Sequence, residues 1–293
     1  MPRQAASQTI AALRTDYHRA ICTDVLAWRP GPPSLNIADS SSRTSKALAE
    51  GLAARLPHPL CRRAKDGQTT GTLFTEHTRG FLEKAFECLH HLRPGEWLFS
   101  TSQASAGIAQ FDQYEHLNEL QRVLAENPEL RAALGGDYLV TPDIIVARAP
   151  VDDPEINRLR QIVGPAGQPP VHTPLRAANV PSRRAILHAS ISCKWTIRSD
   201  RAQNTRTEAL NLIRNRKGKT PIIAAVTAEP LPTRLASIAM GTGDIDCVYH
   251  FALHELQEAV AEADMDGQEE TLSMLVEGRR LRDICDLPFD LAT

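Results

Sequence analysis

Residues 192–208 read Ser192-Cys193-Lys194-Trp195-Thr196-Ile197-Arg198-Ser199-Asp200-Arg201-Ala202-Gln203-Asn204-Thr205-Arg206-Thr207-Glu208. This stretch completes an alternation of apolar and polar residues that begins at Ala185, and this period of two predicts a half-buried β-strand. Such a strand would place Ser192 and Lys194 on one face. A helix-like pattern follows and carries Glu208. The stretch therefore predicts a strand that presents a lysine and leads into a helix with a carboxylate.

The composition is that of an ordinary globular protein, with 42% apolar and 23% charged residues in a chain of 293. That length suffices for one large domain or two modest ones. The net charge of −2 argues against a wholly basic nucleic-acid coat. However, residues 194–219 contain eight Lys or Arg against two acids, whereas residues 255–286 contain ten acids against three Arg. This asymmetry is compatible with a DNA-facing patch, although a solvated helix face would give the same run of charge.

The cysteines and the N-terminus indicate the compartment. Six cysteines are scattered without paired spacing, so neither a zinc site nor a disulfide framework is indicated. No apolar run follows the N-terminus, and no stretch approaches the length that spans a membrane. We therefore expect a cytoplasmic protein. His250 and His254 have the spacing of a metal-binding pair, but no third ligand lies nearby in the sequence, and the pair is interpreted as an ordinary helix edge.

Helices are expected to dominate the N-terminal part. Residues 1–30 have apolar residues at helical spacing. Residues 36–44 are mostly small and polar and precede another helix, a position where serines are more often N-caps than ligand contacts. Residues 66–71 are expected to form a turn before a helix that has Glu76 in its first turn, where a carboxylate meets the helix dipole favourably. A further helix is expected over residues 114–134, ending at a glycine pair.

The C-terminal part alternates between strands and helices. Residues 138–146 are interpreted as a strand that Pro142 interrupts, because proline cannot donate to a sheet ladder, and Asp143 stands where the strand opens. Residues 148–183 contain seven prolines and are expected to form a long excursion between partner strands. The remaining expected elements are strands at 220–227 and 245–249 and helices at about 251–263 and 268–282.

This alternation predicts the α/β class, with a central mixed β-sheet flanked by helices. We expect a single domain over residues 1–293. Within it, a helical part of about 1–135 would pack on an α/β core of about 136–293.

The carboxylates and the lysine of this core suit phosphodiester hydrolysis. That reaction needs metal ions that offset phosphate charge, an activated water and a group that stabilises developing charge. Asp143 is an oxygen ligand of the kind that Mg²⁺ prefers, and Lys194 can orient the water. Glu208 and Glu76 are further carboxylates that helices would supply. Each residue also has an ordinary structural interpretation, such as an exposed lysine, an Asx turn after proline or a helix-start glutamate.

The order of these residues resembles that of the PD-(D/E)xK nucleases in a variant form. Pro142-Asp143 comes first, Ser192-Cys193-Lys194 follows, and Glu208 comes last. In this variant form Ser192 occupies the slot of the acid before the lysine, and Glu208 would supply the missing carboxylate. The resemblance implies a restriction-endonuclease-like core.

Residues 192–201 resemble more closely the NgoMIV-type family of type II restriction endonucleases, which read a CCGG core. Residues 36–42 and 67–71 resemble the same family, so the likeness covers most of the chain. Arginine binds guanine O6 and N7 with two hydrogen bonds, and aspartate accepts one from cytosine N4. The resemblance implies base contacts from three residues of that chemistry: Arg198, Asp200 and Arg201.

The same resemblance implies the remaining site residues. The metal ligands would be Asp143 and the backbone carbonyl of Cys193, with Glu208 and Glu76 as supporting acids and with Lys194 and Ser192 beside the scissile phosphate. The outer base pair would be read by a serine of the N-terminal polar segment and a glutamine before the next helix. Ser42 and Gln68 are the candidates, and Ser41 is nearly as good as Ser42.

The family also implies the activity. A Mg²⁺-dependent type II restriction endonuclease would cut GCCGGC as G/CCGGC and leave 5′-phosphate ends with a 5′ overhang. A symmetric target requires a two-fold dimer, and the family implies a pair of dimers, a homotetramer, with a companion DNA methyltransferase in the host. Two alternatives stay open: a CCGG-core nuclease with different flanking bases, and a protein of the same fold that binds DNA without cleavage.

Overall fold

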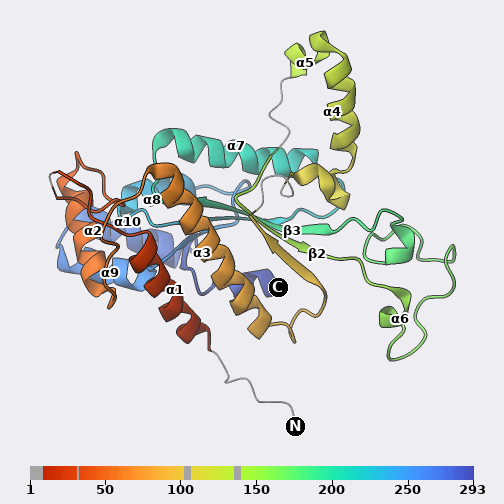
Figure 1. The fold of residues 1–293 in the computed structure, drawn as a ribbon, viewed down its shortest axis with the longest axis horizontal. Coiled ribbons are helices and arrows are strands. Elements are labelled where there is room, and N and C mark those ends of the chain that lie inside the picture. The colour runs from red at the N-terminus through yellow and green to blue at the C-terminus, as the bar shows by residue number, and fades with distance from the viewer. Residues whose placement is uncertain (1–8, 32, 102–106, 135–139) are drawn as a thin grey trace. The chain divides into compact units, whose positions relative to one another are not determined.

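The structure is a computed structural model that describes residues 9–31, 33–101, 107–134 and 140–293 (Figure 1). Its helices are α1 (Ile10–Asp24), α2 (Arg43–Arg55), α3 (Gly67–Cys88), α4 (His116–Glu126), α5 (Pro128–Leu134), α6 (Asp153–Ile156), α7 (Ser199–Asn215), α8 (Pro232–Ala239), α9 (Leu253–Glu262), α10 (Asp266–Glu277) and α11 (Leu287–Ala292). Its strands are β1 (Trp97–Ser100), β2 (Ile144–Arg148), β3 (Ile186–Lys194), β4 (Ile222–Thr227), β5 (Cys247–His250) and β6 (Leu281–Asp283).

The strands form a six-stranded sheet in the order β1-β2-β3-β4-β5-β6. β1 and β2 pair antiparallel, whereas β4, β5 and β6 pair parallel to one another, so the sheet is mixed. Helices precede, separate and follow these strands along the chain. The predicted fold class, an α/β protein with a central mixed sheet flanked by helices, is confirmed.

Two compact units make up the chain. Unit 1 contains Met1–Arg93, Ile191–Thr207 and Ile223–Thr293, and unit 2 contains Pro94–Ser190 and Glu208–Ile222. The single domain with a division near residue 135 stays a prediction.

The core of unit 1 is formed by helices packed beside the parallel strands. α1 packs on α3, α2 on α9, and α8 on α10. β4 is buried at all but its first residue, as expected for a central strand whose two faces are covered. On α3 the buried residues recur at helical spacing and include Phe74, Phe81 and Ala85, which form the apolar face of the helix.

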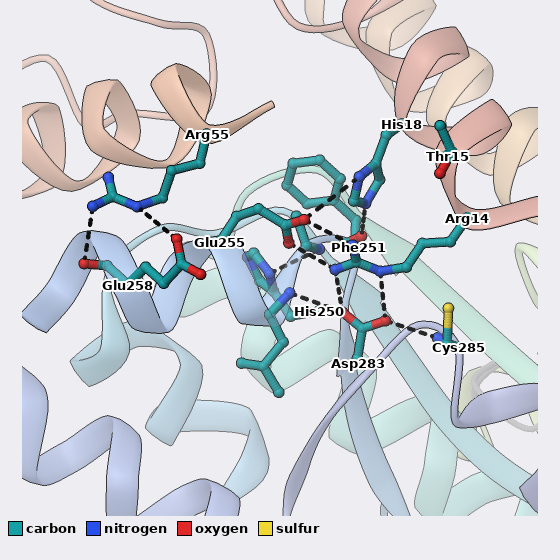
Figure 2. Close-up of polar contacts among 12 residues, drawn as sticks. Arg14, Thr15, His18, Arg55, His250, Phe251, Glu255, Glu258, Asp283 and Cys285 are labelled. Carbon is teal, nitrogen blue, oxygen red and sulfur yellow. Dashed lines mark hydrogen bonds and ion pairs between the residues drawn. The ribbon is translucent and has the colours of Figure 1, made fainter. Parts of the chain in front are cut away.

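A partly buried polar network joins α1 to β6 and α9 in unit 1 (Figure 2). The Arg14 guanidinium donates to both Glu255 oxygens at 2.7 and 2.6 Å and to both Asp283 oxygens at 3.0 and 2.7 Å. Asp283 also accepts the backbone N–H groups of Leu253 at 3.0 Å and Cys285 at 3.1 Å. One arginine thus fixes a helix against a strand end and a helix start, each through two charge-assisted bonds.

Unit 2 is held by two side-chain hubs. Gln113 donates to Leu187 O at 2.7 Å and accepts from Leu187 N–H at 2.9 Å, so one amide pairs with the backbone of β3. Arg176 is 1% exposed and binds both oxygens of Asp153 at 2.7 Å and three carbonyl groups of the 148–183 excursion. The excursion is confirmed, and its hub is the ion pair of the buried Arg176 with the partly exposed Asp153.

Several predicted boundaries are wrong. Residues 67–71 are helical, not a turn, because Asp66 caps α3 by accepting Thr69 N–H at 2.9 Å. Glu76 therefore lies about two and a half turns into α3 rather than in its first turn. The helix expected over 114–134 is broken into α4 and α5, because Pro128 cannot continue the hydrogen-bond ladder of α4.

The strand boundaries differ as well. β2 begins at Ile144 instead of being interrupted at Pro142. β3 alternates between buried and partly exposed residues only near its C-terminal end, whereas its middle is buried on both faces, including His188 and Ser190. The sequence patterns missed β1, β6, α8 and α11. None of the helices in the described part of the chain is long and apolar enough to cross a membrane.

Candidate functional site

The predicted catalytic strand end lies in unit 1. Cys193 and Trp195 are buried, and Ser192 and Lys194 are more exposed, which is the predicted alternation. Trp195 packs edge-on against Phe74 of α3, with 5.0 Å between the ring centroids. The apolar face of this strand end is therefore anchored in the core, and the opposite face carries the serine and the lysine.

The predicted base-reading residues follow directly. Ile197 is 2% exposed, and the next residue, Arg198, is exposed immediately before α7 begins at Ser199. Asp200 and Arg201 lie in the first turn of α7, and their side chains are outside the described part of the structure. The chain passes from the buried Ile197 to the exposed Arg198 in one step, so the arginine side chain leaves the core directly before α7.

A pocket of about 560 Å³ opens beside Arg198 in unit 1. It is lined by three segments of the chain that lie far apart in the sequence: Arg29 with Ile37, Ala38, Asp39 and Ser40, then Thr196, Ile197 and Arg198, and finally Thr233, Arg234 and Ser237 of α8. The lining contains three arginines and one aspartate. The pocket is therefore basic, with one acceptor group among the donors.

Asp39 and Arg234 form an ion pair across this pocket. Asp39 also accepts two hydrogen bonds from Ser41, one from the backbone N–H at 2.9 Å and one from the hydroxyl at 2.7 Å. The bonds from Ser41 and the guanidinium of Arg234 lower the pKa of Asp39 to about 2. Asp39 is thus ionised at every physiological pH and is a permanent acceptor.

The loop that carries Asp39 is built on Asn36. The buried Asn36 amide accepts Ala27 N–H at 3.2 Å and donates to Val25 O at 2.7 Å, so the loop is tied to the chain after α1. Ser42 then caps α2 by accepting Ser45 N–H at 3.1 Å. The interpretation of this serine as an N-cap is confirmed.

Glu229 is a buried carboxylate that the sequence patterns did not indicate. It follows β4, is 0% exposed, and accepts Ile197 N–H at 2.9 Å and Leu231 N–H at 3.3 Å. Burial raises its pKa to about 7, although the two N–H groups and the charge of Arg234 act in the opposite direction. A carboxyl group with a pKa near neutral pH therefore lies next to Ile197, a residue that lines the pocket.

The other predicted site residues lie on separate elements. In unit 1, Glu76 of α3 is partly exposed and accepts from Arg79 Nε at 3.2 Å, and Gln68 is exposed in the first turn of α3. In unit 2, Asp143 directly precedes β2, and Glu208 lies on α7. Both are partly exposed. Asp143 follows the buried Pro142, so the strand end is anchored and the carboxylate is accessible.

The donor groups suit a hard divalent cation by their chemistry. Three carboxylates and one backbone carbonyl are oxygen ligands, and Mg²⁺ is commonly held by one or two carboxylates while it keeps several waters. Among the described residues, no three His, Cys, Asp or Glu side chains gather as a closed metal cage. His250 accepts Ala252 N–H through Nδ1 at 3.1 Å, and burial lowers its pKa to about 4.

Comparison with known proteins adds a family to this geometry. The family described as NgoMIV restriction enzyme matches residues 17–293. A relative from Neisseria gonorrhoeae, the type II restriction enzyme NgoMIV, is 49% identical over 257 residues, which cover 87% of this chain and 88% of the relative.

Proposed function

Because the chain belongs to the NgoMIV restriction enzyme family and is a site-specific deoxyribonuclease, we propose that it cleaves double-stranded DNA at a palindrome with a CCGG core. The proposed site is GCCGGC, cut as G/CCGGC to give 5′-phosphate ends with a 5′ overhang. The observation that carries the proposal is the basic pocket beside Arg198, which begins only two residues after Lys194. A group that reads bases and a group that serves the scissile phosphate thus share one continuous strand end.

Base reading is assigned to residues whose hydrogen bonding suits G·C pairs. Arg198, Asp200 and Arg201 would read the CCGG core, because two arginines can each bind a guanine and the aspartate can accept from cytosine. Arg234 and Asp39 also line the pocket of Arg198, and as an arginine and a carboxylate they suit a further G·C pair. Ser42 or Ser41 and Gln68 remain the proposed contacts to the outer pair. Ser41 is tied to Asp39, so either serine would act beside that acid.

Enzymes of this kind use a divalent metal ion, and Mg²⁺ is the proposed one. Asp143, Glu208, Glu76 and the carbonyl of Cys193 would hold it, and when bound it would offset phosphate charge and activate a water. Lys194 would orient the attacking water and neutralise the non-bridging phosphate oxygen. Ser192 on the same strand face would donate a hydrogen bond to the phosphate.

The proposed assembly is a dimer on each palindrome and a homotetramer of two dimers. The excursion of unit 2 exposes Leu159 at 86% and Ile162 at 60%, so apolar side chains are available there for a contact between copies. A companion DNA methyltransferase would protect the host sites. The proposed location is the cytoplasm. The cysteines are consistent with it, since all six lie in described segments and none is in a disulfide.

Digestion of sequenced plasmids with one or two GCCGGC sites, followed by mapping of the ends, tests the proposal. Mg²⁺ should support cutting after the first G, with the two-site plasmid cut faster. The Lys194→Ala variant should be slower by about 10²–10³-fold, the usual effect of losing one charge-stabilising group. Lys84→Ala, which removes an exposed lysine of α3, is the matched control and should cut normally. Ends mapped to other flanking bases, or normal cutting by Lys194→Ala, would contradict the assignment.

A further inference from the structure

We propose that Glu229 is a positioning residue for sequence recognition, since its single carboxylate holds the backbone that leads into Arg198 and the helix start that carries Arg234. This inference rests on the proposed function, in which those two arginines read bases. Glu229 does not line the pocket, so it would act through the two arginines and not by touching DNA.

The Glu229 carboxylate binds two backbone N–H groups from separate segments of the chain. Oε2 accepts Ile197 N–H at 2.9 Å, and Oε1 accepts Leu231 N–H at 3.3 Å. Its own backbone N–H donates to Thr227 Oγ1 at 3.2 Å, which ties the residue to the end of β4. One buried side chain therefore links the segment after β3 to the start of α8 and fixes both against the sheet.

The two hydrogen bonds of Glu229 position the backbone next to Arg198 and Arg234. Arg198 is exposed, so its reach into the pocket depends on the backbone of Ile197 before it. Leu231 is the N-cap residue of α8 and has no side-chain cap, while Arg234 N–H donates to Leu231 O at 2.9 Å. Glu229 thus holds the N-cap residue of α8, three residues before Arg234. A bidentate contact to guanine has strict geometry, so a shift of either anchor would weaken reading before it unfolded the protein.

The charged and titratable groups near Glu229 compensate its negative charge only in part. Arg234 of α8 approaches Oε2 with Nη1 at 3.9 Å, but that guanidinium is already paired with Asp39 of the 36–42 loop. On β5, His250 is the register partner of Thr227, and its lowered pKa keeps it neutral near pH 7. The carboxylate is therefore incompletely compensated, in agreement with its raised pKa of about 7.

Protonation of such a group changes its hydrogen bonding. The ionised carboxylate has two acceptor oxygens, one for each N–H, whereas the protonated form converts one of them into a donor. The neutral group accepts more weakly than the carboxylate, and its new O–H competes with one backbone N–H, so at least one of the two anchors is weakened. Discrimination between the cognate site and other DNA should therefore rise as the pH increases through about 7.

The test uses the full protein and two labelled duplexes, one with GCCGGC and one with the same bases scrambled. Binding is measured by fluorescence anisotropy in Ca²⁺, without cleavage, from about pH 6 to about pH 8, around the titration of Glu229. The wild-type ratio of the two Kd values should increase with pH. Glu229→Gln keeps the size and one acceptor oxygen, and it should lower that ratio by about tenfold at high pH, the value of one weakened bidentate contact, and flatten its pH profile. The Kd for scrambled DNA should not change, which separates positioning from a general loss of folded protein.

Asp283→Asn is the matched control, since Asp283 is another buried carboxylate that accepts two backbone N–H groups but lies outside the pocket. It should keep the wild-type ratio and profile. A Glu229→Gln protein with the wild-type ratio at every pH overturns the proposal, while preference for GCCGGC by the wild type upholds the proposed function. A wild-type protein without that preference refutes both. If Glu229→Gln does not fold, a wild-type ratio independent of pH is sufficient to overturn the inference.

Discussion

Asp283 and Glu229 are buried acids of unit 1 that solve the same structural problem with different electrostatics. Asp283 is the last residue of β6, Glu229 lies two residues after β4, and each accepts two backbone N–H groups. Asp283 also receives two hydrogen bonds from Arg14 at 3.0 and 2.7 Å (Figure 2). Glu229 has its nearest arginine nitrogen at 3.9 Å, and that arginine is shared with Asp39.

The pKa values express this difference. Burial alone would raise the pKa of Asp283, but the hydrogen bonds and the charge of Arg14 outweigh burial and hold it below its ordinary value. At Glu229 burial dominates and raises the pKa to about 7. A directly paired buried acid is a permanent part of the fold, whereas a weakly paired one behind a binding surface is able to titrate. The difference separates a group that serves stability from one that serves recognition.

The largest effect is expected from Arg14→Ala. The buried Asp283 and the partly buried Glu255 would lose their common partner, and breaking a buried pair costs about 3–5 kcal/mol of the free energy of unfolding. Urea denaturation measures the loss. Arg19→Ala is the control on the same helix, because the pair of Arg19 with Asp16 is more than half exposed and should contribute below about 1 kcal/mol. Equal losses in the two variants would show that the network does not hold α1.

The pH dependence of stability should differ in sign between the two acids. The folded form of Glu229 keeps its proton up to about pH 7, whereas the unfolded chain releases it near 4.5, so this group lowers stability as the pH rises between those values. The full change corresponds to about 3 kcal/mol. Asp283 has a lowered pKa, so its contribution is present above its ordinary value of 3.8 and is lost only in more acidic solution.

Denaturation of the wild type, Glu229→Gln and Asp283→Asn from about pH 5 to about pH 8 checks this sign. The Glu229→Gln protein should lose less stability than the wild type across that range, because a neutral amide does not titrate. Asp283→Asn should be less stable than the wild type by the same amount throughout. Parallel curves for Glu229→Gln and the wild type would place the titration of Glu229 elsewhere.

The sequence was informative where local patterns and packing agree. The period of two before Lys194 predicts β3, and the apolar run after Pro221 predicts β4. It failed at Gly67 and Gly71, whose turn preference is overridden by the Asp66 cap and by the burial of the apolar face of α3. Short elements such as β1 and β6 carry too few residues to show any period.

Glu229 was missed for a related reason. Glu229-Pro230-Leu231-Pro232 has the composition of an exposed turn, and only the tertiary contact with Ile197 makes it a buried anchor. Pro232 is in fact the first residue of α8, the helix position where proline is favoured. An acid placed just after a continuous apolar strand was the available signal. The partnership of Asp39 with Arg234 joins residues 195 positions apart, a separation that local patterns do not address.

The smallest predicted effect comes from a substitution that makes the electrostatic surroundings of Glu229 more like those of Asp283. Asp39→Asn removes a negative charge that raises the pKa of Glu229 and also removes the charged partner of Arg234. Arg234 can then compensate Glu229 more fully, as Arg14 compensates Asp283. The midpoint of the pH profile of discrimination should therefore move to lower pH, by about one unit at most. Anisotropy titrations of the cognate and scrambled duplexes report this midpoint.

Asp16→Asn is the control, because it removes an exposed carboxylate of α1 that is paired with Arg19 and does not line the pocket. Its midpoint should equal that of the wild type. An unchanged or raised midpoint in Asp39→Asn would mean that the charge of Arg234 does not stabilise the ionised form of Glu229. The raised pKa of Glu229 would then reflect burial alone. A lowered midpoint would instead show that Asp39 and Glu229 are coupled through Arg234. The ion pair of Asp39 with Arg234 would then both hold the arginine proposed to read a base and set the pH at which Glu229 is ionised.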